Sequence, residues 1–286
     1  MKNVHGDVAI FGSGFGGSIT ALMLDSLGLT PVVLDKASHP RFTIGESSTP
    51  TGNMILRDLA DRYDLSTLRP MSAHGPWQDA YPDITSGRKR GFSYFHHPRG
   101  ESFAPALDHS NELLVAASSD PYHSDTQWLR ADVDAFLSEK VREAGIPLLE
   151  NTTVTDIDRG DRWRIQAMRN GTPVESRADF IVDATGKSQV LPFLNVPDAG
   201  TSLQTRSRAL FSHFRGLSRW RDYMDAKGAR IGDHPFPCDE AAVHHVLDDS
   251  WLWEIRFDDG RVSAGLVLDA DTHPYSSSQT PREEWR

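Results

Sequence analysis

The first third of the chain alternates short apolar runs with a segment of helical spacing. Val8–Phe11 is an apolar run that leads into glycines, and apolar residues then recur at helical intervals over 18–24. A second apolar run, Pro31–Leu34, ends directly before Asp35. A strand, a tight turn, a helix and a second strand in this order predict a βαβ unit whose two strands are parallel neighbours.

The middle of the chain predicts further helices and strands. Apolar residues at helical spacing predict a helix over 53–62 and another over 130–144, which Gly145 is placed to stop. The segment 71–86 is rich in proline, glycine and aspartate, so we expect an irregular loop there. Alternation predicts a strand over 91–95. Four more runs predict further strands of one mixed sheet, over 148–149, 153–157, 163–167 and 180–183.

After residue 186 the pattern changes to strands that read as antiparallel neighbours. They are expected over 209–214, 242–247, 250–257 and 262–268, with a hairpin turn at Asp258, Asp259 and Gly260. The fold class is therefore α/β, with a Rossmann-like domain (GR2-type βαβ) and a smaller antiparallel-sheet domain that faces the substrate. We assign residues 1–85 and 110–190 to the first domain, and residues 86–109 and 191–286 to the second.

Composition narrows the classes of function. The formal net charge of −10 argues against a nucleic-acid binder, which needs surplus lysine and arginine to neutralise phosphates. Because no stretch reaches the roughly 20 apolar residues that cross a bilayer, and no signal peptide is evident, we expect no membrane span and a cytoplasmic location. Cys238 is the single cysteine, which excludes internal disulfides and agrees with a reducing compartment. We interpret it as an ordinary packed or surface thiol.

The turn after the first strand carries a dinucleotide-binding fingerprint. In Gly12-x-Gly14-x-x-Gly17, the first glycine permits the tight turn, the second allows a pyrophosphate to approach the backbone, and the third lets the helix pack on the strand. The amides around Phe15 and Gly16 would face the phosphates at the positive end of the helix. Asp35 lies where an acidic side chain accepts hydrogen bonds from a ribose. Glycine turns also serve packing alone, but the flanking strand, helix and Asp35 favour a dinucleotide.

Four further segments resemble the flavin-dependent halogenases. The segment 39–47 contains a Gly-Glu-Ser turn like the one that lies beside the flavin in that family, and Asp183-Ala184-Thr185-Gly186 resembles its later flavin-contacting turn. Trp251-Leu252-Trp253-Glu254-Ile255-Arg256 is similar to the family's Trp-x-Trp-x-Ile-Pro signature, with arginine in place of proline. Arg130 resembles a flavin-contacting arginine. Besides the glycine turn and Asp35, the resemblance assigns to FAD the residues Arg41, Gly45, Glu46, Ser47, Arg130, Asp183 and Gly186.

The resemblance implies halogenation of an electron-rich aromatic or phenolic metabolite. In the family, reduced FAD supplied by a separate reductase reacts with O2 to a flavin hydroperoxide, halide attacks it, and hypohalous acid reaches a lysine. Lys89, in Arg88-Lys89-Arg90-Gly91-Phe92, matches the family's lysine at a strand entry. An amine suits this step because it can form a chloramine when neutral or donate a hydrogen bond when charged. Trp251 and Trp253 are the residues expected to face the substrate.

Each of these assignments has a plainer alternative. Lys89 can belong to a solvated basic patch, Arg130 can be a surface charge at a helix start, and Trp251 and Trp253 can be core residues of one strand face. The adjacent histidines at 96–97 and 244–245 point to opposite faces of a strand, so we predict no metal site.

Two alternatives to halogenation stay open. A monooxygenase or a flavin-linked reductase of the same fold would act without halide. Two observations leave room for this alternative. One is Arg256. The other is that we do not find, before the last residue, the family's glycine–aspartate and proline/serine/glycine motifs, which lie near the flavin ring. The second alternative is a truncated fragment that binds flavin without turnover.

Overall fold

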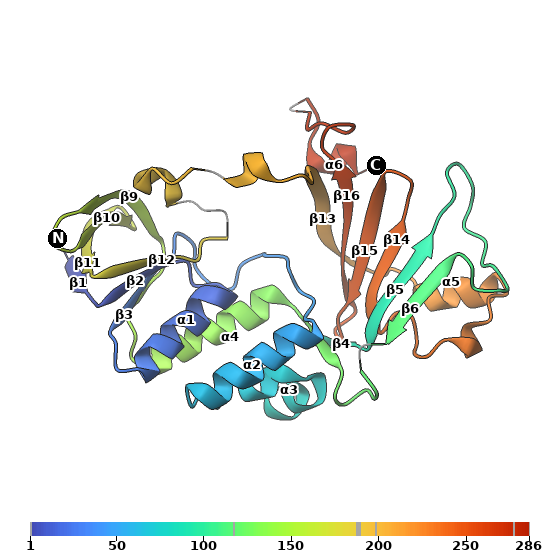
Figure 1. The fold of residues 1–286 in the computed structure, drawn as a ribbon, viewed down its shortest axis with the longest axis horizontal. Helices are drawn as coiled ribbons and strands as arrows, with labels where there is room; N and C mark the ends of the chain where they lie inside the picture. Colours follow the sequence, from blue (N-terminus) through green and yellow to red (C-terminus); the bar gives the residue numbers. More distant parts are fainter. Residues whose placement is uncertain (1, 117, 187–189, 198, 277, 286) are drawn as a thin grey trace. The chain divides into compact units, whose positions relative to one another are not determined.

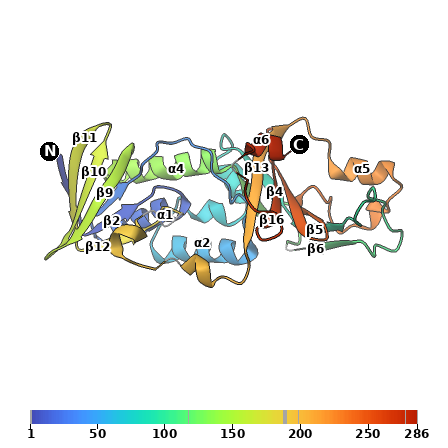
Figure 2. The same cartoon turned by 90° about the horizontal axis from the view of Figure 1, so that it is seen from above.

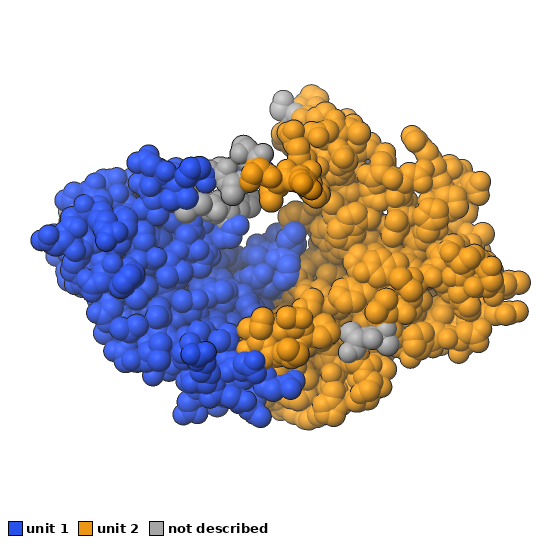
Figure 3. Space-filling model, viewed as in Figure 1, with its two compact units in different colours: residues 1–45, 57–69, 130–201 blue, residues 46–56, 70–129, 202–286 orange. Residues whose placement is uncertain are grey.

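The computed structural model describes residues 2–116, 118–186, 190–197, 199–276 and 278–285. The chain forms two compact units, unit 1 from residues 1–45, 57–69 and 130–201, and unit 2 from residues 46–56, 70–129 and 202–286 (Figure 3). Residues 46–56 and 70–85, which the predicted division placed in the Rossmann-like domain, cluster with unit 2. Residues 110–129 do the same.

Unit 1 contains a parallel sheet with helices on one face. Its strand order is β12 (Phe180–Asp183), β2 (Val8–Phe11), β3 (Pro31–Leu34) and β8 (Leu148–Leu149), and every neighbouring pair is parallel. The predicted βαβ unit is therefore confirmed. Helices α1 (Phe15–Ser26) and α4 (Arg130–Glu143) lie side by side, as Figures 1 and 2 show. Their apolar residues Ala21, Leu22 and Val141 pack with Ile10 and Val33 of the sheet.

A second sheet covers the other face of the parallel sheet. It has the order β1 (Lys2–His5), β11 (Thr172–Ala178), β10 (Trp163–Arg169) and β9 (Thr152–Arg159). The prediction that 153–157 and 163–167 join one mixed sheet with 148–149 and 180–183 is wrong. These strands alternate in burial, whereas β2 and β3 are buried throughout. An alternating strand has only one face to bury, so it forms an antiparallel meander and packs against the parallel sheet.

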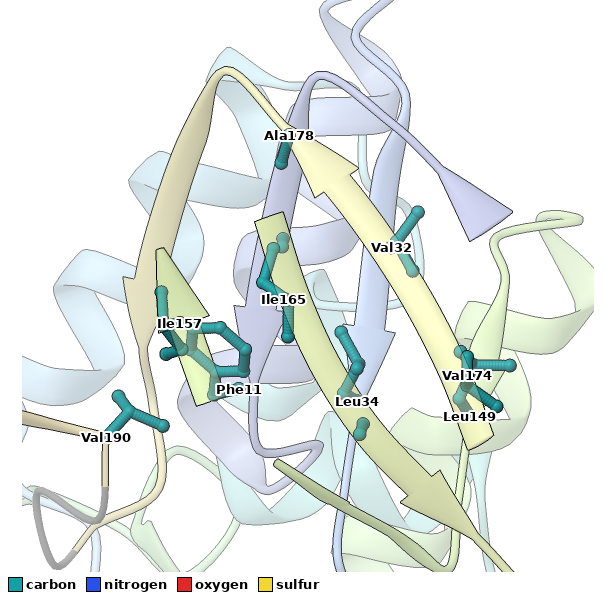
Figure 4. Close-up of a cluster of buried hydrophobic side chains, with 11 residues drawn as sticks. Phe11, Val32, Leu34, Leu149, Ile157, Ile165, Val174, Ala178 and Val190 are labelled. Carbon is teal, nitrogen blue, oxygen red and sulfur yellow. The ribbon is translucent and has the colours of Figure 1, made fainter. Parts of the chain in front are cut away.

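The interface between these two sheets forms the main core of unit 1 (Figure 4). The parallel sheet contributes Phe11 and Leu34, both at most 2% exposed, and β10 contributes Ile165, which is fully buried. Burying a side chain of this size stabilises a fold by about 1.5–3 kcal/mol. The glycine turn thus directly follows a strand, β2, that is buried on one face by the helices and on the other by the second sheet.

Unit 2 is built on a six-stranded sheet. Its order is β13 (Ser207–Arg215), β16 (Arg261–Asp269), β15 (Ser250–Arg256), β14 (Ala241–Val246), β5 (Gly91–His96) and β6 (Glu112–Ala116). The four antiparallel strands predicted after residue 186 are confirmed, and 257–261 form the predicted turn, with the amide of Phe257 donating to the carbonyl of Arg261. The pairing of β14 with β5 is parallel, which the sequence pattern did not indicate.

The predicted loop over 71–86 is wrong, because the segment contains a short helix. Helix α3 (His74–Ala80) follows the 3-10 turn η1 (Arg69–Ser72), and β4 (Ser86–Lys89) pairs with β7 (Asp125–Trp128). Trp77 is fully buried, and the amide of His74 donates to the carbonyl of Ser124. The helix is too short to show a period and is stabilised by these tertiary contacts.

The remaining elements include the predicted helix α2 (Pro50–Arg62), the small helices α5 (Trp220–Ala226) and α6 (Pro281–Glu284), and 3-10 turns η2 (Leu191–Leu194), η3 (Ala199–Ser202) and η4 (Ile231–Asp233). Over the part of the chain that the structure describes, no helix has the length and apolar character of a membrane span.

Candidate cofactor and substrate sites

Two glycines of the fingerprint are required by close backbone approaches. Gly12 has φ +98°, and a Cβ placed on it would lie 2.5 Å from the carbonyl oxygen of Ala184. A Cβ on Gly17 would lie 1.9 Å from the carbonyl oxygen of Gly12. Neither position accepts a side chain, so the turn and the first turn of α1 are fitted to each other as the fingerprint requires.

The Cβ position of Gly14 faces two arginines. A Cβ on Gly14 would lie 3.6 Å from Arg130 Nη2 and 3.7 Å from Arg41 Nη2, with Asp134 Oδ2 at 3.5 Å. Gly14 is also the N-cap of α1 and makes no side-chain cap hydrogen bond. The amides of a helix N-terminus together with guanidinium groups form an environment suited to an anion such as a diphosphate.

Asp35 is turned toward the glycine turn. Its Oδ2 accepts hydrogen bonds from the amide and the hydroxyl of Ser13, both at 2.7 Å, and from Arg41 Nη1 at 2.9 Å. Its Oδ1 accepts from the amide of Ala37 at 2.9 Å. Burial works to raise the pKa of Asp35, but the hydrogen bonds from Ser13 and Ala37 and the charge of Arg41 outweigh it and hold the pKa below its ordinary value. Asp35 therefore stays ionised at the sheet edge, with lone-pair capacity left on Oδ1.

Arg130 connects the start of α4 to the segment before the Gly-Glu-Ser turn. Its guanidinium forms two hydrogen bonds with the buried carboxylate of Asp134, at 2.8 and 2.9 Å. It also donates to the carbonyl oxygens of Ile44 and Gly45, at 3.0 and 3.3 Å. These contacts argue against the alternative of a surface charge at a helix start.

The other predicted cofactor residues fall into two groups. Asp183 and Gly186 lie at the carboxyl end of β12, where Asp183 Oδ1 accepts from the amide of Thr185 at 2.9 Å and the next residue, Ala184, touches the Gly12 turn. Glu46 and Ser47 belong to unit 2. Glu46 is 2% exposed, with Oε1 2.9 Å from His213 Nε2, and Ser47 forms a β-bridge with Gln127.

Lys89 is fully buried at the end of β4. Its Nζ donates to the carbonyl of Ser48, lies 3.8 Å from the ring centroid of Phe92 and is 3.9 Å from Asp125 Oδ2. Burial lowers the pKa of Lys89 to about 8, and the carboxylate of Asp125 only partly offsets this effect. The alternative of a solvated basic patch therefore does not apply to Lys89, although its neighbour Arg88 is part-exposed and pairs with Glu240.

Asp125 is a functional candidate that the sequence did not reveal. Burial raises its pKa to about 6, against the opposing effect of the Lys89 charge. Its Oδ1 accepts a hydrogen bond of 2.7 Å from Asn53 Nδ2, which lies 72 residues away in the chain. The only signal in the sequence is an aspartate at the start of an unpredicted four-residue strand, so spacing alone could not have found it.

One face of the six-stranded sheet carries a row of aromatic rings. The strand registers place Tyr94, His244 and Trp251 on the same face, and the ring centroids are 4.6 Å apart for Tyr94 and His244 and 5.4 Å for His244 and Trp251. Trp251 is 38% exposed, so the alternative of a core position does not hold for it. Trp253 packs over Gly265, where a Cβ would meet the indole at 2.1 Å.

A pocket of about 670 Å³ opens at one end of this aromatic row. Tyr94, His244 and Trp251 line it, together with Asp248 and Asp249. Such a volume falls in the range of small-molecule sites. Aromatic rings that stack side by side offer a flat apolar surface to an aromatic ligand.

Arg256, which replaces the proline of the family signature, points to the opposite face of β15 from Trp251. Its Nε donates to Asp239 Oδ1 at 3.0 Å, and its Nη1 donates to the carbonyl of Leu217 at 3.2 Å. The departure from the signature thus changes a structural contact of the sheet and leaves the aromatic row intact.

The parallel βαβ unit, its fitted glycine turn and the ionised aspartate beside it define a Rossmann-like dinucleotide-binding fold. No protein-family model matches the chain. It is 28% identical over 287 residues to monodechloroaminopyrrolnitrin halogenase PrnC of Pseudomonas fluorescens, and 27% identical over 288 residues to tetracycline 7-halogenase of Kitasatospora aureofaciens, with 98% of this chain covered in both. The resemblance to the flavin-dependent halogenase family is thereby confirmed.

A solved structure supports the same relationship. Halogenase PltM in complex with phloroglucinol and FAD superimposes with a TM-score of 0.84 at 26% identity, covering 98% of this chain and 55% of PltM. The expected fold class, that of Rossmann-like FAD-binding halogenases, is confirmed. The chain spans about half the length of the curated relatives it matches, 48% of PrnC and 50% of tetracycline 7-halogenase.

Proposed function

We propose that this chain binds FAD and carries the lysine of a flavin-dependent halogenase that acts on an electron-rich aromatic or phenolic compound. The observation that carries the proposal is the buried Lys89, whose Nζ lies 3.8 Å from the Phe92 ring, because Phe92 lies on the aromatic face of the sheet. The halogenase relatives and the FAD-bound neighbour support the same function.

The described residues fit FAD. The diphosphate would take the amides at the start of α1, with Arg41 and Arg130 beside Gly14, and the ribose would take the remaining capacity of Asp35 Oδ1. We assign Gly45, Asp183 and Gly186 to contacts farther along the cofactor, and Glu46 and Ser47 to the flavin side of the site. When bound, FAD supplies the reaction with O2 and halide that generates the halogenating agent.

Lys89 would hold or transfer the electrophilic halogen. With a pKa of about 8, its Nζ has both protonation states available near neutral pH, whereas an ordinary lysine is almost wholly charged. Asp125 would act as a positioning residue, because its carboxylate at 3.9 Å favours the charged form of Lys89. Asn53 in turn holds Asp125 by a hydrogen bond.

The aromatic row would bind the substrate. Trp251 and Tyr94 offer ring faces to a stacked aromatic, and the pocket they line belongs to the same unit as Lys89. The PltM neighbour was solved with phloroglucinol, an aromatic of the predicted phenolic kind. The proposal also includes a separate flavin reductase as the source of reduced FAD, and a cytoplasmic location, for which the free cysteine Cys238 is the support.

One experiment tests cofactor binding and turnover separately. The purified chain is incubated with FAD and gel-filtered, and flavin absorbance in the protein peak reports binding. The loaded protein is then given NADH, a flavin reductase, chloride or bromide, and phloroglucinol as the aromatic probe. We expect bound flavin and a halogenated product in the mass spectrum. Hydroxylation without halide would favour a monooxygenase, bound flavin without product would favour a flavin-binding fragment, and absence of bound flavin would refute the proposal.

A further inference from the structure

We infer that His109, Glu112 and His234 form a binding site for a divalent transition-metal ion of the zinc type. The three residues lie in unit 2, and the site is independent of the proposed halogenation. His109 lies in the loop before β6, Glu112 begins β6, and His234 directly follows η4. The sequence suggested no metal site because His109 and His234 are 125 positions apart, and only folding brings these two histidines together.

The donor atoms are close enough to share one ion. One ligand atom from each of the three residues lies within 4.8 Å of the other two. Glu112 Oε1 is 3.0 Å from His234 Nε2 and also hydrogen-bonds His109 Nδ1. Two imidazoles and one carboxylate that leave a position open form a ligand set well known for zinc, and imidazole selects against calcium and magnesium.

The burial of Glu112 calls for a positive partner. The side chains of Glu112 and His234 are each 4% exposed. The Oε2 atom of Glu112 is shielded from solvent and has no hydrogen-bond partner among the described residues. A buried carboxylate needs compensation for its lost hydration, and the contacts of Glu112 with the two imidazoles both involve Oε1. A divalent ion at this position would supply the charge and a bond to the carboxylate.

An outer carboxylate orients one of the proposed ligands. His109 Nε2 lies 3.4 Å from Asp233 Oδ2, on the side of the ring away from Glu112. A histidine that binds a metal through one nitrogen typically donates its other N–H to a carboxylate, which fixes the tautomer. Asp233 is adjacent to His234 in the chain, so the turn that carries one ligand also orients the other.

The loop holds His109 in place without help from an ion. His109 has φ +60°, a backbone conformation that residues other than glycine rarely adopt. The amide of His109 donates to the carbonyl of Ala106, the amide of Glu112 donates to the carbonyl of His109, and the side chain of Asn111 accepts from the amide of Ala106. The side chain of His109 is 34% exposed, which leaves an entry path. A bound ion would tie this loop to η4.

The test uses the untagged full chain after treatment with a chelator and dialysis. It is titrated with Co²⁺, and the visible absorption reports coordination, after which Zn²⁺ displaces the Co²⁺. We expect one ion per chain, loss of the Co²⁺ spectrum on addition of Zn²⁺, and a higher midpoint of thermal unfolding with saturating Zn²⁺.

Variants decide where the ion binds. We expect His109→Ala and Glu112→Gln to weaken Co²⁺ binding by at least about 10-fold. His109→Ala alters a part-exposed side chain and is therefore the variant that best preserves the fold. The matched control is His123→Ala, since His123 pairs with Asp120 at 3.0 Å but is 70% exposed and belongs to no three-ligand cluster among the residues that the structure describes. Binding that is absent or non-stoichiometric, or that survives in both ligand variants, would overturn the inference and leave Glu112 bridged by its histidines alone.

Discussion

Lys89 and Asp125 form a buried pair in which Nζ and Oδ2 are 3.9 Å apart, longer than a direct hydrogen bond. The two side chains are 0% and 5% exposed. Each group therefore shifts the pKa of the other, and this coupling can be measured directly. We expect Asp125→Asn to lower the pKa of Lys89 further below about 8, by on the order of one unit, because the carboxylate is what raises it.

The measurement is an NMR titration of the protein with ¹³C-labelled lysine. Lys36 on the exposed surface is the internal control and should not respond to the substitution. If Lys89 titrated at the same pH in both proteins, Asp125 would have no role in setting its charge.

The same pair predicts how stability depends on pH. The pKa of Lys89 is about 8 when folded and 10.5 in its ordinary state, so the folded protein binds fewer protons than the unfolded chain between these values. Stability from this group therefore rises with pH from about 8 to 10.5. We expect Lys89→Met to remove this rise, which amounts to up to about 3 kcal/mol, in urea unfolding measured at several pH values. An unchanged slope would show that Lys89 is not buried in solution.

Lys89→Met also tests the proposed chemistry. We expect halogenation to fall by at least about 100-fold, while the affinity for FAD stays within about 2-fold, because in the proposed reaction the lysine would act after the cofactor has bound. Arg88→Met is the matched control, since Arg88 is the preceding residue and pairs with Glu240 at the surface. The assay is single-turnover product formation by mass spectrometry. Full turnover in Lys89→Met would exclude the lysine as the catalytic residue.

The two neighbouring glycines at 16 and 17 offer an internal comparison. A Cβ on Gly17 would lie 1.9 Å from the carbonyl oxygen of Gly12, whereas a Cβ on Gly16 would have no described atom within 4 Å. We expect Gly17→Ala to destabilise the protein by about 1–3 kcal/mol or more and to abolish FAD binding, and Gly16→Ala to be neutral or slightly stabilising in the helix. Urea unfolding and flavin titration of both variants give the result. Equal stability and equal FAD affinity in the two variants would contradict the close packing of the start of α1 against the Gly12 turn.

A substitution at Arg130 tests the part of the proposed cofactor site at the start of α4. Because Arg130 pairs with the buried Asp134, we would replace both with alanine so that no uncompensated charge remains. We expect the dissociation constant of FAD to rise by at least about 10-fold in a flavin fluorescence titration. Lys140→Ala on the same helix, where the lysine pairs with Glu143 at the surface, is the control. FAD affinity equal to that of the control would remove Arg130 from the site.

Trp251 tests the substrate surface. We expect Trp251→Ala to raise the KM for an aromatic substrate about 10-fold, with FAD affinity unchanged, because stacking on the exposed indole would be lost. Tyr275→Ala provides the control, since Tyr275 is 68% exposed and does not line the pocket. Steady-state kinetics separate KM from kcat, and an unaltered KM would place the substrate elsewhere.

Local patterns were sufficient for the βαβ unit, because its strands are continuous apolar runs and its turn needs glycine at particular places. They were insufficient where a segment is stabilised by distant contacts. Helix α3 depends on the burial of Trp77, and the role proposed for Asp125 depends on its contacts with Lys89 and Asn53. The sequence pointed to Lys89 as catalytic only through a resemblance. That its amine is buried depends on the fold.

The indole of Trp253 rests on Gly265 of the neighbouring strand, in the space that a side chain at 265 would fill. Because Gly265 has no side chain, the indole of Trp253 lies close to the backbone of the sheet. Any enlargement at 265 would displace this indole, whose ring centroid lies 6.0 Å from that of Trp251, a residue proposed to contact the substrate. Substitution at position 265 therefore offers a way to alter the range of substrates without changing any residue that is expected to contact the ligand.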